Sequence, residues 1–247
     1  MVFRHCFVAS GLIAFFTFGC SGGANSSAEN TTQVVQESNV TQLFIEAKAT
    51  QKAEDSFHQG NNLLDGQHYE DAIKAYDKAI AIKVENPEAW INRGIALTSL
   101  QRYQDALASY DRAIAIKPDK YEAWYNRGIA LTSLQRYKDA IASYNRAIAI
   151  KPDKYEALIN RGIALTKLHR YQDAIASYNR AIAIKQDLHQ AYYNKACSYA
   201  LQSNLELAIE NLDKAIKLVP DKYKKLAKTD PDFSKVRSEK QFQELIQ

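Results

Sequence analysis

The sequence contains few of the residue patterns that enzyme chemistry needs. Among its 247 residues there are three cysteines and five histidines, and the histidines share no metal-ligand spacing. There is no nucleophile elbow, no glycine loop that could hold a phosphate, and no cysteine pair of the zinc type. Carboxylates such as Glu88, Glu122 and Glu156 recur at a constant interval instead of converging on one point. We therefore expect no enzymatic activity, no cofactor, no metal ion and no small-molecule substrate.

Net charge and strand-like patterns are also scarce. The formal net charge is +4, although 24% of the residues are charged, and this excess is too small to favour nucleic acid as a partner. Almost no segment alternates apolar and polar residues in the manner of a half-buried strand. These absences predict an all-α protein that does not bind nucleic acid.

The apolar run near the N-terminus, over residues 7–18, is too short to cross a bilayer. Arg4 precedes it, and a basic flank followed by a short apolar stretch is typical of an export signal. The run stops at a Gly-Cys pair ending in Cys20, which resembles a bacterial lipoprotein signal. That resemblance implies removal of residues 1–19 and lipidation of Cys20. The alternative is ordinary secretion with cleavage after a small residue such as Ala24.

Residues 20–48 are predicted to form a flexible polar tether, because the first half of this segment consists mainly of Ser, Asn, Thr, Gln and Gly. Several acyl chains on Cys20 would supply stable membrane attachment. An acylated Cys20 cannot pair with Cys197, so we expect no intrachain disulfide. The implied location is the bacterial cell envelope, with the protein anchored on the periplasmic or outer face of a membrane.

One fixed period organises the rest of the chain. Gly94 recurs as Gly128 and Gly162, and the segments 87–120 and 121–154 differ at only five positions. A constant period of this size, the interval from Gly94 to Gly128, is the signature of stacked supersecondary units.

Each unit is predicted to contain two helices. Within 87–120, apolar residues at helical spacing predict a first helix that ends near Leu100 and a second that ends near Ile116. Gly94 lies inside the first helix, where glycine costs about 1 kcal/mol relative to alanine. We expect the two helices to approach each other too closely at Gly94 for a larger side chain.

The pattern W-x3-G-x2-L-x5-Y-x2-A-x3-Y-x2-A-x4-P holds in full in 87–120 and 121–154 and with departures in three further copies, and it resembles the tetratricopeptide repeat (TPR). This resemblance implies a right-handed superhelical α-solenoid of five helix-turn-helix units followed by a C-terminal capping helix. Residues 223–247, which include the run Asp-Pro-Asp-Phe ending at Phe233, resemble an element often found behind bacterial TPR arrays. Within 49–222, the five repeats are 53–86, 87–120, 121–154, 155–188 and 189–222.

One column of the repeat departs from the family pattern. Where a TPR unit usually has an aliphatic residue just before the glycine, this chain has Arg93, Arg127 and Arg161. We expect each arginine stem to lie on apolar surface while its charged head remains in water.

In TPR proteins the first helices of the units line a concave groove, and the resemblance implies the same here. The groove would be an apolar strip flanked by a row of asparagines, whose amides can donate and accept hydrogen bonds and so suit an extended peptide backbone. The alternative is that these asparagines cap or bridge neighbouring helices. The candidate groove residues are Phe57, Asn61, Ile91, Asn92, Ile95, Tyr125, Asn126, Ile129, Ile159, Asn160, Ile163, Tyr193 and Asn194.

One known TPR binding mode is not expected in this chain. Chaperone-binding members hold a C-terminal carboxylate with asparagines and basic residues. The chain keeps the two asparagines, Asn61 and Asn92, but has Phe57, Glu122 and Asn126 where the basic residues would stand. A carboxylate would meet Glu122, so we expect that clamp to be absent.

Together these features predict a non-catalytic protein–protein interaction scaffold. It would be a membrane-anchored adaptor that binds a partner protein or an extended peptide in its concave groove. The alternative is a structural subunit of an envelope assembly, which self-associates through the ends or the convex face of the solenoid. The sequence leaves the oligomeric state open.

Overall fold

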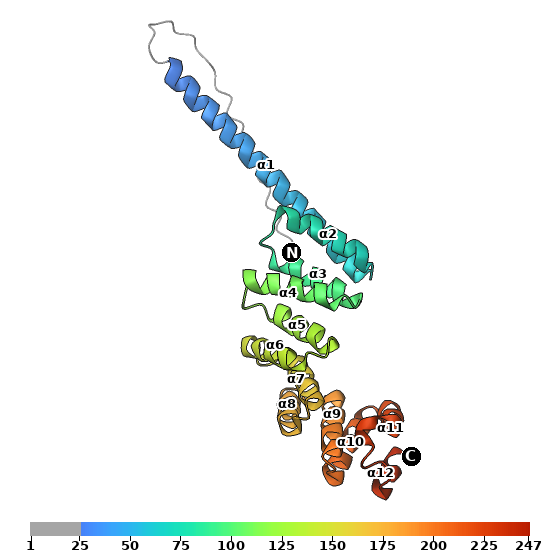
Figure 1. The fold of residues 1–247 in the computed structure, drawn as a ribbon. Helices are drawn as coiled ribbons and strands as arrows, with labels where there is room; N and C mark the ends of the chain where they lie inside the picture. The colour runs from blue at the N-terminus through green and yellow to red at the C-terminus, as the bar shows by residue number, and fades with distance from the viewer. Residues whose placement is uncertain (1–25) are drawn as a thin grey trace, which may run out of the picture. The chain divides into compact units, whose positions relative to one another are not determined.

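The computed structural model describes residues 26–247, with side-chain environments from residue 38 onward, and over this range the chain forms helices and no strands (Figure 1). The predicted signal peptide over 1–19 and Cys20 lie outside the described residues. Within 26–247 no helix combines the length and the apolar character needed to span a membrane. The all-α prediction is confirmed for the described chain.

The chain divides into two compact units, 1–48 and 49–247. Helix α1 extends over Ser26–Asp65, so the described part of the first unit is helical. The sequence predicts a flexible tether over 20–48, and from residue 26 onward the structure differs from that prediction. No glycine or proline occurs between residues 26 and 59, so the polar segment contains no residue that would interrupt a helix.

The second unit is a stack of helical hairpins, one for each predicted repeat (Figure 1). From the second repeat onward, each second helix packs against the first helix of its own repeat, and in the first four repeats it packs against the first helix of the next repeat. The helix ends expected near residues 100 and 116 are confirmed. The helices are α2 (Tyr69–Ile82), α3 (Pro87–Ser99), α4 (Tyr103–Ile116), α5 (Tyr121–Ser133), α6 (Tyr137–Ile150), α7 (Tyr155–Lys167), α8 (Tyr171–Ile184), α9 (His189–Leu201) and α10 (Leu205–Leu218).

Residues after α10 close the C-terminal end of the stack. Helix α11 (Pro220–Thr229), the 3₁₀ turn η1 (Pro231–Phe233) and helix α12 (Lys240–Ile246) pack on α9 and α10. Phe233 and Phe242 are fully buried, with ring centroids 5.2 Å apart. Where the sequence predicts a single capping helix, the structure has two short helices and a turn. We call residues 220–247 the cap.

The glycine of each first helix makes room for a buried tyrosine of the second helix. A Cβ atom added to Gly94 would lie 2.5 Å from Cε1 of Tyr110, and the corresponding distance from Gly128 to Tyr144 is 2.4 Å. Tyr110 is fully buried, and its hydroxyl lies 3.0 Å from Oγ1 of Thr98. The close approach expected at Gly94 is confirmed, with an aromatic ring as the neighbour.

The fifth repeat changes both members of this contact. Ala196 occupies the glycine position, and Leu212 occupies the tyrosine position, in the same relation as Gly94 and Tyr110. Both side chains are fully buried. Leucine lacks the ring that reaches the first helix, so it leaves space for the alanine methyl group.

The arginine that precedes each glycine joins two repeats. Nε of Arg127 donates to Oδ1 of Asp111 in the preceding repeat at 2.7 Å. Nη1 of Arg127 donates to Oγ of the buried Ser143 in its own repeat, also at 2.7 Å. Arg93 forms the matching pair of bonds one repeat earlier. The charged head therefore has a role that the sequence does not predict, because the guanidinium group is the part that connects the repeats.

We predict that Gly94→Ala destabilises the protein by about 1–3 kcal/mol, because the added methyl group overpacks against Tyr110. In an exposed helix the same change would stabilise by about 1 kcal/mol. In a Tyr110→Leu background, Gly94→Ala should lose most of its effect, since the fifth repeat already combines alanine with leucine. Urea denaturation of the wild type, the two single variants and the double variant measures this coupling. Additive effects of the two changes would contradict the prediction.

We also predict that Arg127→Met lowers the free energy of unfolding by about 1–3 kcal/mol, because it leaves the buried Ser143 hydroxyl without its donor and removes a link between repeats. Arg136→Met is the matched control. Arg136 pairs with Asp139 on the surface, where both side chains are about half exposed, so its loss should cost less than about 1 kcal/mol. Equal shifts of the urea midpoint for the two variants would show that the Arg127 link adds nothing to stability.

Candidate peptide-binding groove

The first helices of consecutive repeats form one continuous surface. Helix α3 contacts α5, α5 contacts α7 and α7 contacts α9, whereas no two second helices in the described chain approach each other as closely. The first helices are therefore the inner row of the stack, and their shared face lines its inner side. All thirteen candidate groove residues lie on first helices, from α1 through α9.

Five of the candidate residues occupy one shared position of the repeat, and three of them are buried. Ile91, Ile159 and Tyr193 are only 5, 6 and 7% exposed. Phe57 and Tyr125 are half-buried. This column therefore contributes more to packing between repeats than to surface that a partner could cover.

The row of asparagines divides into two groups. Asn92 Nδ2 donates to Asn61 Oδ1 of the preceding repeat at 2.9 Å, and the hydroxyl of Tyr76 donates to the same oxygen at 2.9 Å. Asn160 Nδ2 donates to the hydroxyl of Tyr125, also one repeat earlier, at 3.1 Å. These three asparagines bridge neighbouring repeats, as the alternative interpretation requires.

Asn126 and Asn194 do not form such bridges within the described chain. Asn126 Nδ2 donates only to the carbonyl oxygen of Glu122 in its own helix, at 2.9 Å. Asn194 is half-buried on α9 and lines two pockets. Beside these amides lie the half-buried side chains of the apolar strip, Ile95, Ile129 and Ile163. The combination of amides that form no bridge between repeats and apolar surface is what an extended peptide backbone and its side chains need.

Two pockets lie at the C-terminal end of the inner side. An open pocket of about 320 Å³ is lined by five of the candidate groove residues together with residues of α11. A second pocket of about 210 Å³ adjoins it and shares Ile163 and Asn194 with it. The candidate residues in the larger pocket are Ile159, Asn160, Ile163, Tyr193 and Asn194.

Residues of the cap complete the larger pocket, and the sequence analysis missed them. Lys222, Tyr223 and Leu226 line it from α11. Lys222 is the last residue of the fifth predicted repeat, whereas Tyr223 and Leu226 lie beyond the repeats to which the groove was assigned. One signal could have revealed them. Tyr223 follows His189 by one full period, so the periodicity continues for one more step beyond the fifth repeat. The two side chains are in contact, with 2.5 Å between Nδ1 of His189 and the hydroxyl of Tyr223.

Acidic residues on the inner side are paired with lysines in the middle repeats. Glu88 forms an ion pair with Lys120, and Glu122 forms one with Lys151 at 2.8 Å. Partial burial acts against the charged form of Glu88, but the hydrogen bond from Lys120, a backbone hydrogen bond and the charges of Lys120 and Lys117 together outweigh it. The pKa of Glu88 therefore lies below its usual value. Each of these carboxylates is therefore charged and neutralised by a lysine of its own repeat.

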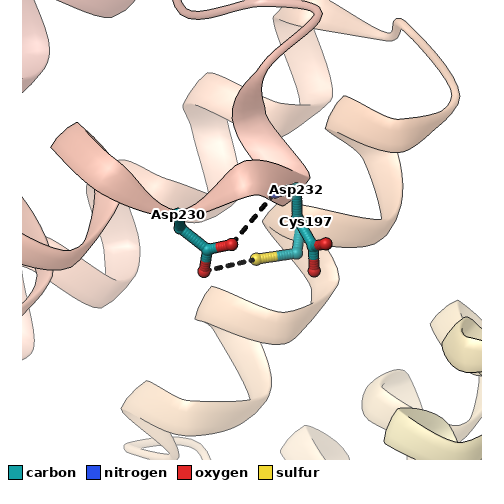
Figure 2. A group of neighbouring side chains, drawn as sticks. All are labelled: Cys197, Asp230 and Asp232. Atoms are coloured by element: carbon teal, nitrogen blue, oxygen red, sulfur yellow. Dashed lines mark hydrogen bonds between the residues drawn. The ribbon is translucent and has the colours of Figure 1, made fainter.

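Cys197, Asp230 and Asp232 form a cluster whose sulfur and oxygen atoms lie within 4.8 Å of one another (Figure 2). Asp230 accepts hydrogen bonds from the hydroxyl of Tyr193 at 2.7 Å and from the backbone N–H of Asp232 at 3.0 Å. The Cys197 thiol points at the same carboxylate, 3.9 Å away. Burial, followed by the two carboxylates, raises the pKa of Cys197 well above its usual value. Because a metal needs the thiolate, this cluster fits a hydrogen-bonded joint between α9 and the cap better than a metal site.

Comparison with known proteins supports this description of the fold. Family models described as tetratricopeptide repeat match residues 57–120, 102–155, 155–188 and 189–222. The crystal structure of YrrB, described as a TPR protein with an unusual peptide-binding site, is 25% identical, covers 73% of this chain and 92% of YrrB, and superposes with a TM-score of 0.63. No protein with a curated description matches the chain.

Two structures of MamA share the fold at lower identity. One is 22% identical over 72% of this chain and 96% of MamA, with a TM-score of 0.64. The other, from Desulfovibrio magneticus RS-1, is 21% identical over 68% of this chain and 94% of that chain, with a TM-score of 0.65. With family models matching more than half of its length and hairpins stacked in the same way, the chain belongs to the tetratricopeptide repeat family.

Proposed function

We propose that this protein is a non-catalytic scaffold that binds an extended segment of a partner polypeptide along the inner side of its repeats. The observation that carries the proposal is the pair of adjoining pockets at the C-terminal end, where apolar side chains lie beside the amide of Asn194, which no bridge between repeats uses. The similar protein YrrB is described as having a peptide-binding site. These observations favour a polypeptide over a small molecule, because the surface is open and elongated.

We further propose that the protein is exported and anchored to a membrane of the bacterial envelope through a lipidated Cys20. The support is the N-terminal sequence: a basic residue, a short apolar run and the Gly-Cys junction. A lipid anchor would hold the scaffold near a membrane and leave its inner side free to recruit a partner.

The groove predicts a specific pattern of crosslinks. A photoreactive benzoylphenylalanine in place of Asn126 or Asn194 should capture a partner polypeptide in intact cells. The same group in place of Asn179, which is exposed on the second helix α8, should not. Replacing both Asn126 and Asn194 by Ala should weaken binding of the captured partner by about tenfold, since each lost hydrogen bond contributes about 0.5–1.5 kcal/mol. Capture at all three positions, or unchanged affinity of the double variant, would argue against groove binding.

The anchor predicts that a clickable fatty acid labels the wild-type protein and that the protein fractionates with membranes. Cys20→Ser should abolish both the label and the membrane association, because no other residue is expected to carry the acyl chains. Cys197→Ser is the control and should retain both. A mature N-terminus after Ala24 in the wild type, measured by mass spectrometry, would instead establish ordinary secretion.

A further inference from the structure

We propose that the partner segment carries an acidic side chain next to a large apolar side chain, and that Lys222 and the pocket beside the cap receive these two groups. This inference rests on the proposed function and specifies the chemistry of the segment that the groove binds.

The apolar half of the proposal follows from the lining of the larger pocket. Ile159 and Ile163 of α7 form one side, and Leu226 of α11 forms another. Leu226 is 41% exposed, whereas Tyr223 and Ala227 beside it in the cap are buried. The pocket of about 320 Å³ is roomy enough for a leucine or phenylalanine side chain. Covering Leu226 with such a side chain would remove apolar surface from water.

The acidic half follows from a comparison between repeats. The second position of the repeat is glutamate in the first four repeats, and in the second repeat Glu88 pairs with Lys120, the last residue of that repeat. In the fifth repeat the same two positions are Gln190 and Lys222, and both line the pocket. Compared with the second repeat, the lysine is retained while its carboxylate is replaced by an uncharged amide. A partner carboxylate would supply the group that the repeat no longer provides.

Lys222 lacks a close counter-charge in the part of the chain whose side chains are described. It has no ion pair within 4 Å among residues 38–247. Its Nζ lies 5.2 Å from the ring centroid of Tyr223. The nearby His189 adds no charge at neutral pH, because burial, reinforced by Lys222, lowers its pKa below its usual value. The other residues that line the larger pocket are uncharged, so the pocket carries a single positive charge.

An internal acidic residue fits this site better than a chain terminus. The smaller pocket shares Ile163 and Asn194 with the larger one, so open surface lies beyond the larger pocket for the rest of a bound chain. One lysine also offers only a point charge, whereas the clamp for terminal carboxylates needs several basic residues that this chain lacks.

The test uses the mature chain and fluorescent nine-residue peptides with amidated C-termini. A central leucine is flanked by aspartates in one peptide and by lysines in a second, and a third keeps the aspartates but replaces leucine by serine. In fluorescence anisotropy the wild type should bind the aspartate–leucine peptide about three- to tenfold more tightly than either of the others. The preference over the lysine peptide should shrink in 1 M NaCl, because salt screens exposed charges.

Three variants make the assignment specific. Lys222→Glu should reverse the preference toward the lysine peptide. Gln190→Glu should restore the pairing seen between Glu88 and Lys120 and weaken binding of the aspartate–leucine peptide about threefold. Lys225→Glu, on an exposed residue of α11 that does not line the pocket, is the matched control and should keep the wild-type preference. Circular dichroism confirms that each variant is folded.

The inference is overturned if Lys222→Glu leaves the preference for the aspartate–leucine peptide unchanged, or if none of the amidated peptides binds. It is also overturned if the same peptides bind only when their C-termini are free carboxylates. Those outcomes do not overturn the proposed function, which is judged separately by crosslinking from Asn126 and Asn194. Loss of those crosslinks would end both proposals, whereas crosslinks without a charge preference would end this one alone.

Discussion

The contact between a glycine of the first helix and a buried tyrosine of the second helix sets the geometry of the array. The ring of Tyr110 occupies the space that a methyl group on Gly94 would need, so the two helices of the hairpin fit together at one spacing. Because Gly128 and Tyr144 repeat the contact, successive hairpins have the same shape. Identical hairpins are what allow residues at one position of the repeat to align on the inner side, and a peptide-binding surface depends on that alignment.

Contacts between repeats use different chemistry from contacts within them. Inside each hairpin the fit is mainly one of shape, whereas Arg127 connects two hairpins through directed hydrogen bonds to Asp111 and Ser143. Asn92 does the same on the inner side through Asn61. Directed bonds fix the register of one hairpin on the next. They also use up polar groups, so only the amides left out of such bridges are available to a partner.

The fixed period was enough to predict the hairpins, since every repeat encodes the same packing and the copies support one another. The sequence was less informative where partners lie far apart in the chain. The hydrogen bonds of Arg127 reach helices 16 residues away in both directions, and no helical pattern reveals such a partner. The helix from residue 26 was missed because polar composition was read as coil, although the segment contains no residue that breaks a helix. Leu226 was missed because it lies beyond the last repeat.

The residues by which the fifth repeat differs from the other repeats are of two kinds. The difference between these two kinds indicates where a partner segment binds. In the fifth repeat, the exchange of glycine for Ala196 is matched by the exchange of tyrosine for Leu212, so the pair preserves packing. The exchange of glutamate for Gln190 has no such match, because Lys222 remains. A residue change that is matched by a change in its neighbour, as for Ala196 and Leu212, preserves the fold. A change without such a match, as for Gln190, leaves the charge of Lys222 without its carboxylate. The repeats of this protein are nearly identical, and their stacking explains most of the residues that they share. Stacking does not explain the unmatched pair Gln190 and Lys222, which lines an open pocket.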